Sequence, residues 1–232
     1  MDHYVFGYGS LAGPREEDAY VTELRDAVRV WGVAMDNRRD LPGYKYYVLA
    51  GTDERPDVCV TFLDLADRPG GTVNGVCRKV GAETLAGLDR RERNYARVDV
   101  SERVGVAHGQ VWAYAGLAES RERLRAARAA GRAVIARGYH DAVLRGFEAL
   151  GGAELDRFRA STEEPDGLPL LGPGAGGSSL GGATRLGPRD PRSPGAGRGR
   201  AAHQAGPAPL LYCAVALWAR RTPGAVPASA GW

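Results

Sequence analysis

Short apolar runs separated by turn residues fill the first half of the 232-residue chain. Most are bounded by Gly, Pro, Asn or Asp, a pattern typical of β-strands joined by turns. The pattern predicts strands over residues 4–8, 28–35, 46–50, 58–65, 72–80, 98–106 and 110–114. Residues 14–27 are polar and acidic, and we expect them to form a short helix or an ordered loop.

Helical periodicity becomes stronger in the second half. It predicts helices over residues 81–93, 119–130 and 139–149, followed by a further helical turn over 154–160. The third helix is amphipathic through Val143, Leu144 and Phe147. Many short strands with helices interrupting and following them predict an α+β fold, a small mixed β-barrel with flanking helices. They do not predict a regular βαβ repeat.

Composition changes near residue 165. Residues 161–232 contain 14 of the 33 glycines and 10 of the 14 prolines, and few apolar periods. Such a segment buries too little apolar surface to offset the entropy of ordering it. We therefore predict one folded domain over residues 1–165 and a disordered Gly/Pro/Arg-rich tail over 166–232.

The net charge divides in the same way. From residue 166 onward, seven arginines face only Asp166 and Asp190, so the tail carries +5 and the rest of the chain −2. The predicted domain thus lacks the basic surface typical of nucleic-acid binding. We expect no nucleic-acid partner.

Cysteines and histidines indicate neither disulfides nor a metal. Cys59 and Cys77 lie in apolar runs and are expected to be small buried thiols, Cys213 leaves an odd number, and no C-x-x-C occurs. The four histidines lack metal-ligand spacing, so we expect no metal. No signal peptide is recognised, and the apolar run over 210–219 is too short to span a bilayer. These features predict a cytoplasmic protein without a membrane partner.

The first predicted strand runs into a glycine-rich turn, Gly7-Tyr-Gly-Ser-Leu-Ala-Gly13. The backbone N–H groups of such a turn can face a ligand. The spacing nearly matches a dinucleotide fingerprint, and Asp36 follows at the end of the next strand. That interpretation requires a long helix directly after the glycines, and here Pro14 and an acidic cluster follow. A tight turn without a ligand is a further alternative.

A second candidate is Glu92. If the predicted helix runs through it, Leu85, Leu88, Glu92 and Tyr95 form one stripe of the helix. The carboxylate then faces the core or a cleft, where it is suited to general acid/base catalysis. The alternative is a glutamate satisfied by a neighbouring arginine or by backbone at a helix end.

Two motifs together resemble one enzyme family. Tyr8-Gly-Ser-Leu11, with Leu88-Asp-Arg-Arg-Glu92 followed by Tyr95, is similar to the γ-glutamylcyclotransferase superfamily, which includes AIG2-like and ChaC-type proteins. The resemblance extends from Tyr4 to about Thr162. It implies a small mixed β-barrel with flanking helices, a glutamyl-binding N-terminal turn and one glutamate that carries protons.

The resemblance also assigns roles. Glu92 would be the general acid/base, and the substrate-binding residues would be Tyr8, Gly9, Ser10, Leu11, Tyr95 and Tyr139. The implied reaction cyclises a γ-glutamyl group to 5-oxoproline and releases the attached amine, amino acid or peptide. It needs no cofactor, and we expect a monomer or a homodimer that acts on a small γ-glutamyl substrate.

The chain also departs from this family. Leu11 stands where many members have Asn, and residues 36–47 lack the aromatic-rich pattern of glutathione-specific members. The tail matches nothing in the family. The leaving group therefore stays open. The alternatives are a related amide-bond reaction on another γ-glutamylated molecule, a non-catalytic binding or regulatory module, and the nicotinamide-dependent enzyme.

Overall fold

The structure is a computed structural model that describes residues 1–13, 19–39, 45–49, 53–105, 109–172 and 184–186. Its contacts divide the chain into two units, Met1–Ala196 and Gly197–Trp232, and every described residue belongs to the first. Most of the predicted tail, together with Cys213 and residues 210–219, lies outside the described residues. No helix in the described part is long and apolar enough to cross a membrane.

Two long antiparallel strands, β2 (Ala19–Asp36) and β4 (Cys59–Val80), form the centre of the fold. Their pairing runs from Ala19↔Arg78 to Asp36↔Cys59. The register shifts between Arg25 and Ala27 and again between Trp31 and Val33. Such irregularities bend a strand and increase its twist.

The described part corrects two sequence predictions here. Residues 19–27 are strand rather than helix or loop, and residues 66–71 continue β4 instead of separating two strands. At this bend Asp26 has a φ of 56°, and its carboxylate accepts a hydrogen bond of 2.9 Å from Gly70 N–H. A Cβ on Gly71 would lie 2.6 Å from the Ala27 carbonyl oxygen. The Pro-Gly-Gly sequence therefore permits a close approach of two backbones within the strand pair.

The remaining strands of the curled sheet lie beside β4. Strand β1 (His3–Gly7) is antiparallel to β4 and parallel to β6 (Gln110–Gly116), which is antiparallel to β5 (Tyr95–Asp99). The predicted strand 98–106 thus begins earlier and gives way to a 3₁₀ turn, η2 (Ser101–Arg103). An isolated bridge from Leu24 to Val104 links β2 to the segment after β5. The sheet therefore curls back on itself.

Shorter strands extend the other end of β4. Strand β7 (Ala133–Ala136), which the sequence analysis did not identify, is parallel to β4. Strand β8 (Leu170–Leu171) is parallel to β7, so the described fold continues a few residues past the predicted boundary at 165. Strand β3 (Lys45–Tyr47) pairs with β9 (Thr184–Leu186) in a separate two-stranded sheet.

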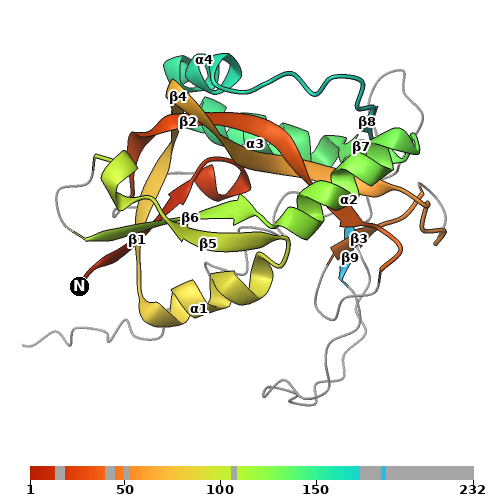
Figure 1. The fold of residues 1–232 in the computed structure, drawn as a ribbon, viewed down its shortest axis with the longest axis horizontal. Coiled ribbons are helices and arrows are strands. Elements are labelled where there is room, and N and C mark those ends of the chain that lie inside the picture. The colour runs from red at the N-terminus through yellow and green to blue at the C-terminus, as the bar shows by residue number, and fades with distance from the viewer. Residues whose placement is uncertain (14–18, 40–44, 50–52, 106–108, 173–183, 187–232) are drawn as a thin grey trace, which may run out of the picture. The chain divides into compact units, whose positions relative to one another are not determined.

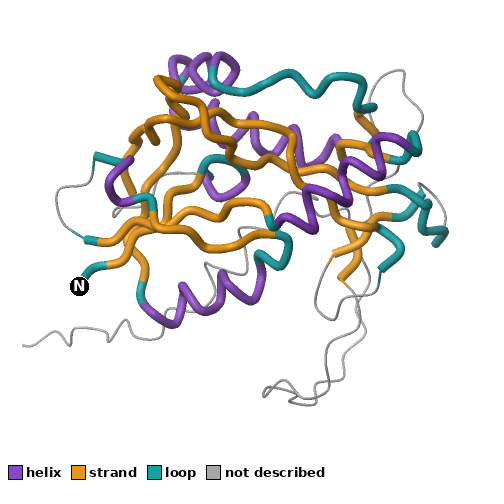
Figure 2. The backbone as a smooth tube through the Cα atoms, viewed as in Figure 1, coloured by secondary structure: helices purple, strands orange, loops and turns teal. Residues whose placement is uncertain are grey.

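Helices surround the strands (Figures 1 and 2). Helix α1 (Ala82–Arg91) and helix α4 (Gly152–Ala160) lie on opposite sides of the strands, and α3 (Arg137–Leu150) packs against α4 and the turn after β1. Helix α2 (Ala118–Ala129) packs along β2. The predicted α+β class with a mixed sheet is confirmed.

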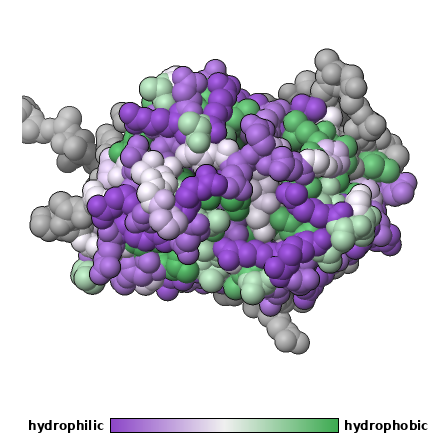
Figure 3. Space-filling model, turned by 45° about the horizontal axis from the view of Figure 1, so that its top comes forward, coloured by the Kyte–Doolittle hydropathy of each residue, from purple (hydrophilic) through white to green (hydrophobic). Residues whose placement is uncertain are grey.

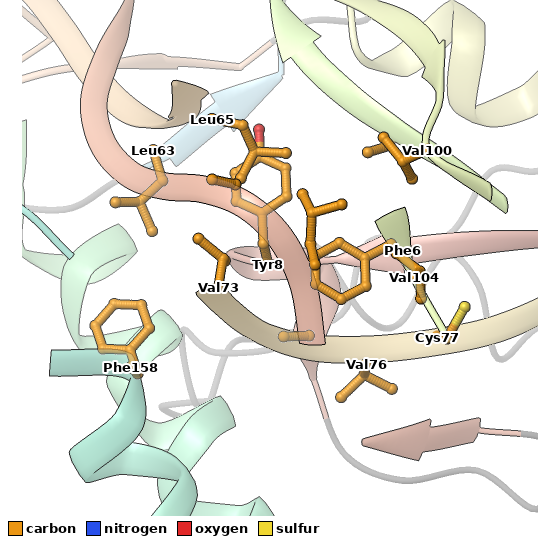
Figure 4. Packing of buried hydrophobic residues seen from close by; sticks show 14 of the residues in the cluster. Phe6, Tyr8, Leu63, Leu65, Val73, Val76, Cys77, Val100, Val104 and Phe158 are labelled. Atoms are coloured by element: carbon orange, nitrogen blue, oxygen red, sulfur yellow. The ribbon is translucent and has the colours of Figure 1, made fainter. Parts of the chain in front are cut away.

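The main core lies inside the curled sheet. Figure 4 shows Tyr8 within this cluster, together with Phe6, Leu65 and Val73. Cys59 and Cys77 are free and buried, as predicted. Among the described residues, Met1 is the only large hydrophobic side chain recorded as exposed, and on the face in Figure 3 hydrophobic residues form small separate patches.

Candidate functional site

A sharp turn after β1 begins the candidate site. The chain passes through Tyr8 and Gly9 into a single 3₁₀ turn, η1 (Ser10–Ala12), closed by a 2.8 Å hydrogen bond from Ala12 N–H to the Gly9 carbonyl. A Cβ on Gly7 would lie 2.4 Å from the Leu11 carbonyl oxygen, so only glycine permits this fold-back. Within the turn Tyr8 and Gly9 are buried and Ser10 is exposed.

This geometry argues against the dinucleotide alternative. A dinucleotide-binding unit needs a long helix after the glycines and a parallel strand beyond it. Here η1 has three residues, and the next described strand, β2, begins at Ala19 and is antiparallel to β4. We therefore exclude the nicotinamide interpretation.

Three tyrosine side chains from distant parts of the chain gather beside the turn. The Tyr95 hydroxyl donates to the Leu63 carbonyl at 2.8 Å, and Leu63 N–H donates to the Tyr139 hydroxyl at 3.4 Å. A Cβ placed on Gly9 would lie 3.3 Å from the same Tyr139 hydroxyl. The Tyr8 hydroxyl donates to the Tyr114 carbonyl at 2.5 Å. The cluster of Tyr8, Tyr95 and Tyr139 around Leu63 is called the tyrosine cluster below.

Tyrosine hydroxyls bond the Leu63 backbone just beyond the point where the pairing of β4 with β7 ends. Strand β4 pairs with β7 only through Thr61, and Leu63 lies two residues further along β4. Its N–H and carbonyl groups are bonded by tyrosine hydroxyls, as the obligatory pairing of buried backbone groups requires. The Tyr139 ring is fixed edge-on against Phe62 and Trp31.

Glu92 lies at the end of α1, not within it. Helix α1 ends at Arg91, and Glu92 is its C-terminal cap, with its N–H bonded to the Leu88 carbonyl at 2.8 Å. The predicted stripe through Tyr95 is therefore wrong, because Tyr95 belongs to β5. The Glu92 side chain is 19% exposed, and Arg91 contacts its Oε1 at 2.8 Å.

Electrostatics nevertheless connect Glu92 with the tyrosine cluster. Burial raises the pKa of Tyr8, Tyr95 and Tyr139, and the negative charge of Glu92 raises all three further. The Glu92 charge is therefore felt at each of the three hydroxyls. The sequence-predicted residues Tyr8, Gly9, Tyr95, Tyr139 and Glu92 come together in one region.

Ser10 and Leu11 have different surroundings. The Ser10 side chain faces solvent. The Leu11 side chain packs with Leu85 and Leu88 of α1 and with Tyr114. Of the residues in this turn, only Tyr8 belongs to the tyrosine cluster, and Gly9 lies beside it. The side chains of Ser10 and Leu11 point elsewhere.

Three neighbours of the tyrosine cluster are not predicted from the sequence. Asp64 is buried and accepts hydrogen bonds from Arg121 and from Gly116 N–H, both at 2.7 Å. Tyr47 is buried in a cluster against which Tyr95 and Tyr139 pack. Arg29 is fully buried and donates to the Tyr8 carbonyl at 2.7 Å. None of the three carries a local sequence signal, because each is defined by segments distant in the chain.

In the described ranges, no group of three or more His, Cys, Asp or Glu side chains is placed to hold a metal ion. The polar groups of this region are hydroxyls, carboxylates, guanidinium groups and backbone amides. Such groups can bind a polar small molecule and transfer protons.

The chain is similar to several solved structures. No family model and no curated protein matches the chain. A γ-glutamyl cyclotransferase is similar with a TM-score of 0.43 and 15% identity, over 72% of this chain and 90% of that one. An uncharacterized protein from Homo sapiens is similar with a TM-score of 0.43 and 17% identity over the same shares. YkqA from Bacillus subtilis is similar with a TM-score of 0.45 and 17% identity, over 73% of this chain and 56% of that one.

Proposed function

We propose that the chain is a γ-glutamylcyclotransferase-type enzyme that converts a γ-glutamyl group to 5-oxoproline and releases the attached amine, amino acid or peptide. The observation that carries this proposal is the convergence of the Tyr8–Gly9 turn, Tyr95 and Tyr139 within reach of the Glu92 charge. These residues come from three separate segments, residues 8–9, residues 92–95 and Tyr139. They are also the residues that the sequence resemblance names.

The reaction transfers an acyl group within one molecule. The substrate α-amine attacks its own γ-carbonyl carbon, the new C–N bond closes a five-membered lactam, and the original amide C–N bond breaks. Glu92 takes a proton from the attacking nitrogen and delivers it to the leaving nitrogen. No oxidant, reductant or cofactor is needed to balance these steps.

The two oxygens of Glu92 have different surroundings. Both recorded contacts from Arg91 are to Oε1. Oε2 has no recorded partner in the described part of the chain, so we assign the proton transfer to Oε2. Arg91 then holds the carboxylate in place while the other oxygen acts.

The tyrosine cluster supplies the shape of the proposed site. Burial keeps the three hydroxyls neutral at ordinary pH, so they act as hydrogen-bonding groups rather than bases. The turn N–H groups of Gly9, Ser10 and Leu11 are proposed to bind the substrate α-carboxylate or the developing oxyanion. Enclosure of the substrate brings amine and carbonyl together, and this proximity supplies much of the acceleration.

A second candidate is a binding module of the same fold without turnover. The Arg91–Glu92 ion pair favours it, because it gives the carboxylate a local partner. On that view Glu92 stabilises the end of α1, and the tyrosine cluster binds a ligand that is not converted.

A substrate panel tests the first proposal. The wild-type chain is incubated with γ-glutamyl dipeptides, γ-glutamylamines and glutathione, and 5-oxoproline is measured by chromatography. We expect Glu92→Gln to lower the rate by about 100-fold or more, because it removes the proton carrier but keeps the shape of the side chain.

Glu83 provides the matched control. It lies exposed in the first turn of α1, so Glu83→Gln makes the same chemical change on the same helix and is expected to keep wild-type activity. Equal activity of Glu92→Gln and wild type would refute the role of Glu92. Binding of these substrates without any 5-oxoproline release by the folded wild type would support the binding module instead.

A further inference from the structure

Arg29 is a buried cation whose partners are all neutral. It lies on β2, is fully buried, and sits against the rings of Phe147 and Phe158, with Cζ-to-centroid distances of 5.1 and 4.3 Å. No carboxylate among the described residues forms an ion pair with it. Its guanidinium donates instead to the Tyr8 and Asn74 carbonyls at 2.7 and 2.5 Å and to the Ser161 and Thr162 hydroxyls, both at 2.9 Å.

This arrangement is costly for stability. Buried charges in proteins are ordinarily paired with an opposite charge, because burial without one loses hydration that neutral groups replace only in part. Burial lowers the pKa of Arg29 to about 9, so the side chain is still charged at neutral pH. The guanidinium therefore keeps its positive charge inside the protein while its own hydrogen-bond partners are neutral.

The position of that charge relates it to the proposed site. Its Nε–H bonds the Tyr8 carbonyl, which belongs to the same peptide group as Gly9 N–H. A charged donor on a carbonyl polarises its peptide group and makes the N–H a stronger donor. The Arg29 charge also acts on the Tyr8 and Tyr139 hydroxyls, opposing the effects of burial and of Glu92.

We propose that Arg29 is a positioning residue that fixes the Tyr8–Gly9 peptide and makes this turn favourable for a carboxylate-bearing ligand. The inference rests on the proposed function, in which that ligand is the γ-glutamyl substrate. Arg29 touches no substrate atom in this scheme. It acts through the peptide that it holds and through its uncompensated charge.

Ser161 allows the charge to be cancelled without altering Arg29. This residue is half-buried at the C-terminal end of α4, and its hydroxyl already contacts the guanidinium. Ser161→Asp places a carboxylate beside Arg29, and Ser161→Asn adds a side chain of the same shape without charge. The pair separates the effect of charge from that of size.

The experiment measures ligand affinity and kinetics for both variants. Calorimetry uses 5-oxoproline and 2-pyrrolidinone, the latter being the same lactam without the carboxylate. We expect Ser161→Asp to weaken 5-oxoproline binding about tenfold and to raise KM by a similar factor with little change in kcat. Ser161→Asn is expected to stay within about threefold of wild type, and 2-pyrrolidinone should not distinguish the variants.

The outcomes separate this inference from the proposed function. Equal affinities of the two variants for 5-oxoproline, or no wild-type preference for it over 2-pyrrolidinone, would overturn the role of Arg29. If wild type and Ser161→Asn bind 5-oxoproline, Ser161→Asp does not, and wild type releases no 5-oxoproline from any substrate, the cyclotransferase proposal is refuted. The positioning role of Arg29 is then retained. If Ser161→Asp does not fold, Thr162→Asp and Thr162→Asn provide the same comparison from the neighbouring hydroxyl.

Discussion

The Tyr95 hydroxyl donates to the Leu63 carbonyl, and this bond links β5 to β4. In Tyr95→Phe the carbonyl loses its donor while the ring stays in place. An acceptor left unpaired in a buried site costs about 1–2 kcal/mol. We expect the free energy of unfolding in urea to fall by that amount.

Tyr20 gives the contrasting control. Its hydroxyl is buried with no normal hydrogen-bond partner recorded in the described part of the chain, and it faces the Cys77 thiol, a weak partner. Tyr20→Phe therefore removes a polar group that gains little from its surroundings. We expect it to be neutral or slightly stabilising. Equal losses from the two substitutions would show that ring packing, not the Leu63 bond, sets the effect.

A side chain at Gly9 would crowd the tyrosine cluster of the proposed site. A methyl group there would lie 3.3 Å from the Tyr139 hydroxyl, closer than most real contacts, and would displace it by a few tenths of an ångström. We expect Gly9→Ala to reduce kcat/KM by about ten- to hundredfold, because small displacements at a reacting centre have large kinetic effects. Unfolding should change much less. The rate of 5-oxoproline release and urea unfolding together test this.

Gly13 is the matched glycine. A Cβ there would meet no atom within 4 Å, so Gly13→Ala is expected to leave the rate unchanged. If Gly9→Ala is as active as Gly13→Ala, the contact between the turn and Tyr139 does not position the substrate. The resemblance would then have assigned Gly9 a role without effect.

Periodicity predicted the helices and the apolar strands well, but not where elements end or join. The Leu85–Leu88 stripe predicts α1, yet spacing continues through Glu92 although the helix ends at Arg91. Tyr95 lies in β5 instead, where its hydroxyl donates to the carbonyl of Leu63, a residue 32 positions earlier in the chain. Similarly, Pro69-Gly-Gly is typical of a turn, and only pairing with β2 makes it part of one long strand.

The candidate site was predictable only where it carries a motif. The Tyr8–Leu11 turn and Glu92 are found from their sequence motifs, but no sequence pattern identifies Arg29 as part of the site. Arg29 shares its face of β2 with Ala27 and Trp31, but an arginine in a strand is ordinarily at the surface. Here that face is covered by Phe147 of α3 and Phe158 of α4, which no local pattern predicts.

Across the described part of the chain, five tyrosine hydroxyls are held away from water. Burial is the main reason that the pKa is raised above the ordinary value of 10 at Tyr8, Tyr20, Tyr95, Tyr114 and Tyr139. They come from the turn after β1, from strands β2, β5 and β6 and from helix α3, so they report on several parts of the described fold. Ionising any of them within the native structure places a negative charge where water cannot stabilise it.

This predicts alkaline unfolding with a defined sign. A group whose pKa is higher in the folded state binds more protons there, so its stabilisation is complete below about pH 10 and is lost as the pH rises further. Arg29 has the opposite sign, because its pKa is lowered to about 9 and stability rises as it loses its proton. Five tyrosines outweigh one arginine. The free energy of unfolding in urea should therefore be nearly flat up to about pH 9 and fall steeply above about pH 10, by about 1.4 kcal/mol per pH unit for each net proton.

Ultraviolet absorbance of tyrosinate should show exposed tyrosines ionising first and the buried ones together with loss of circular dichroism. Smooth ionisation of all tyrosines near pH 10 in a folded protein would show that these hydroxyls are open to solvent, and the enclosed site proposed around Leu63 would lose its basis.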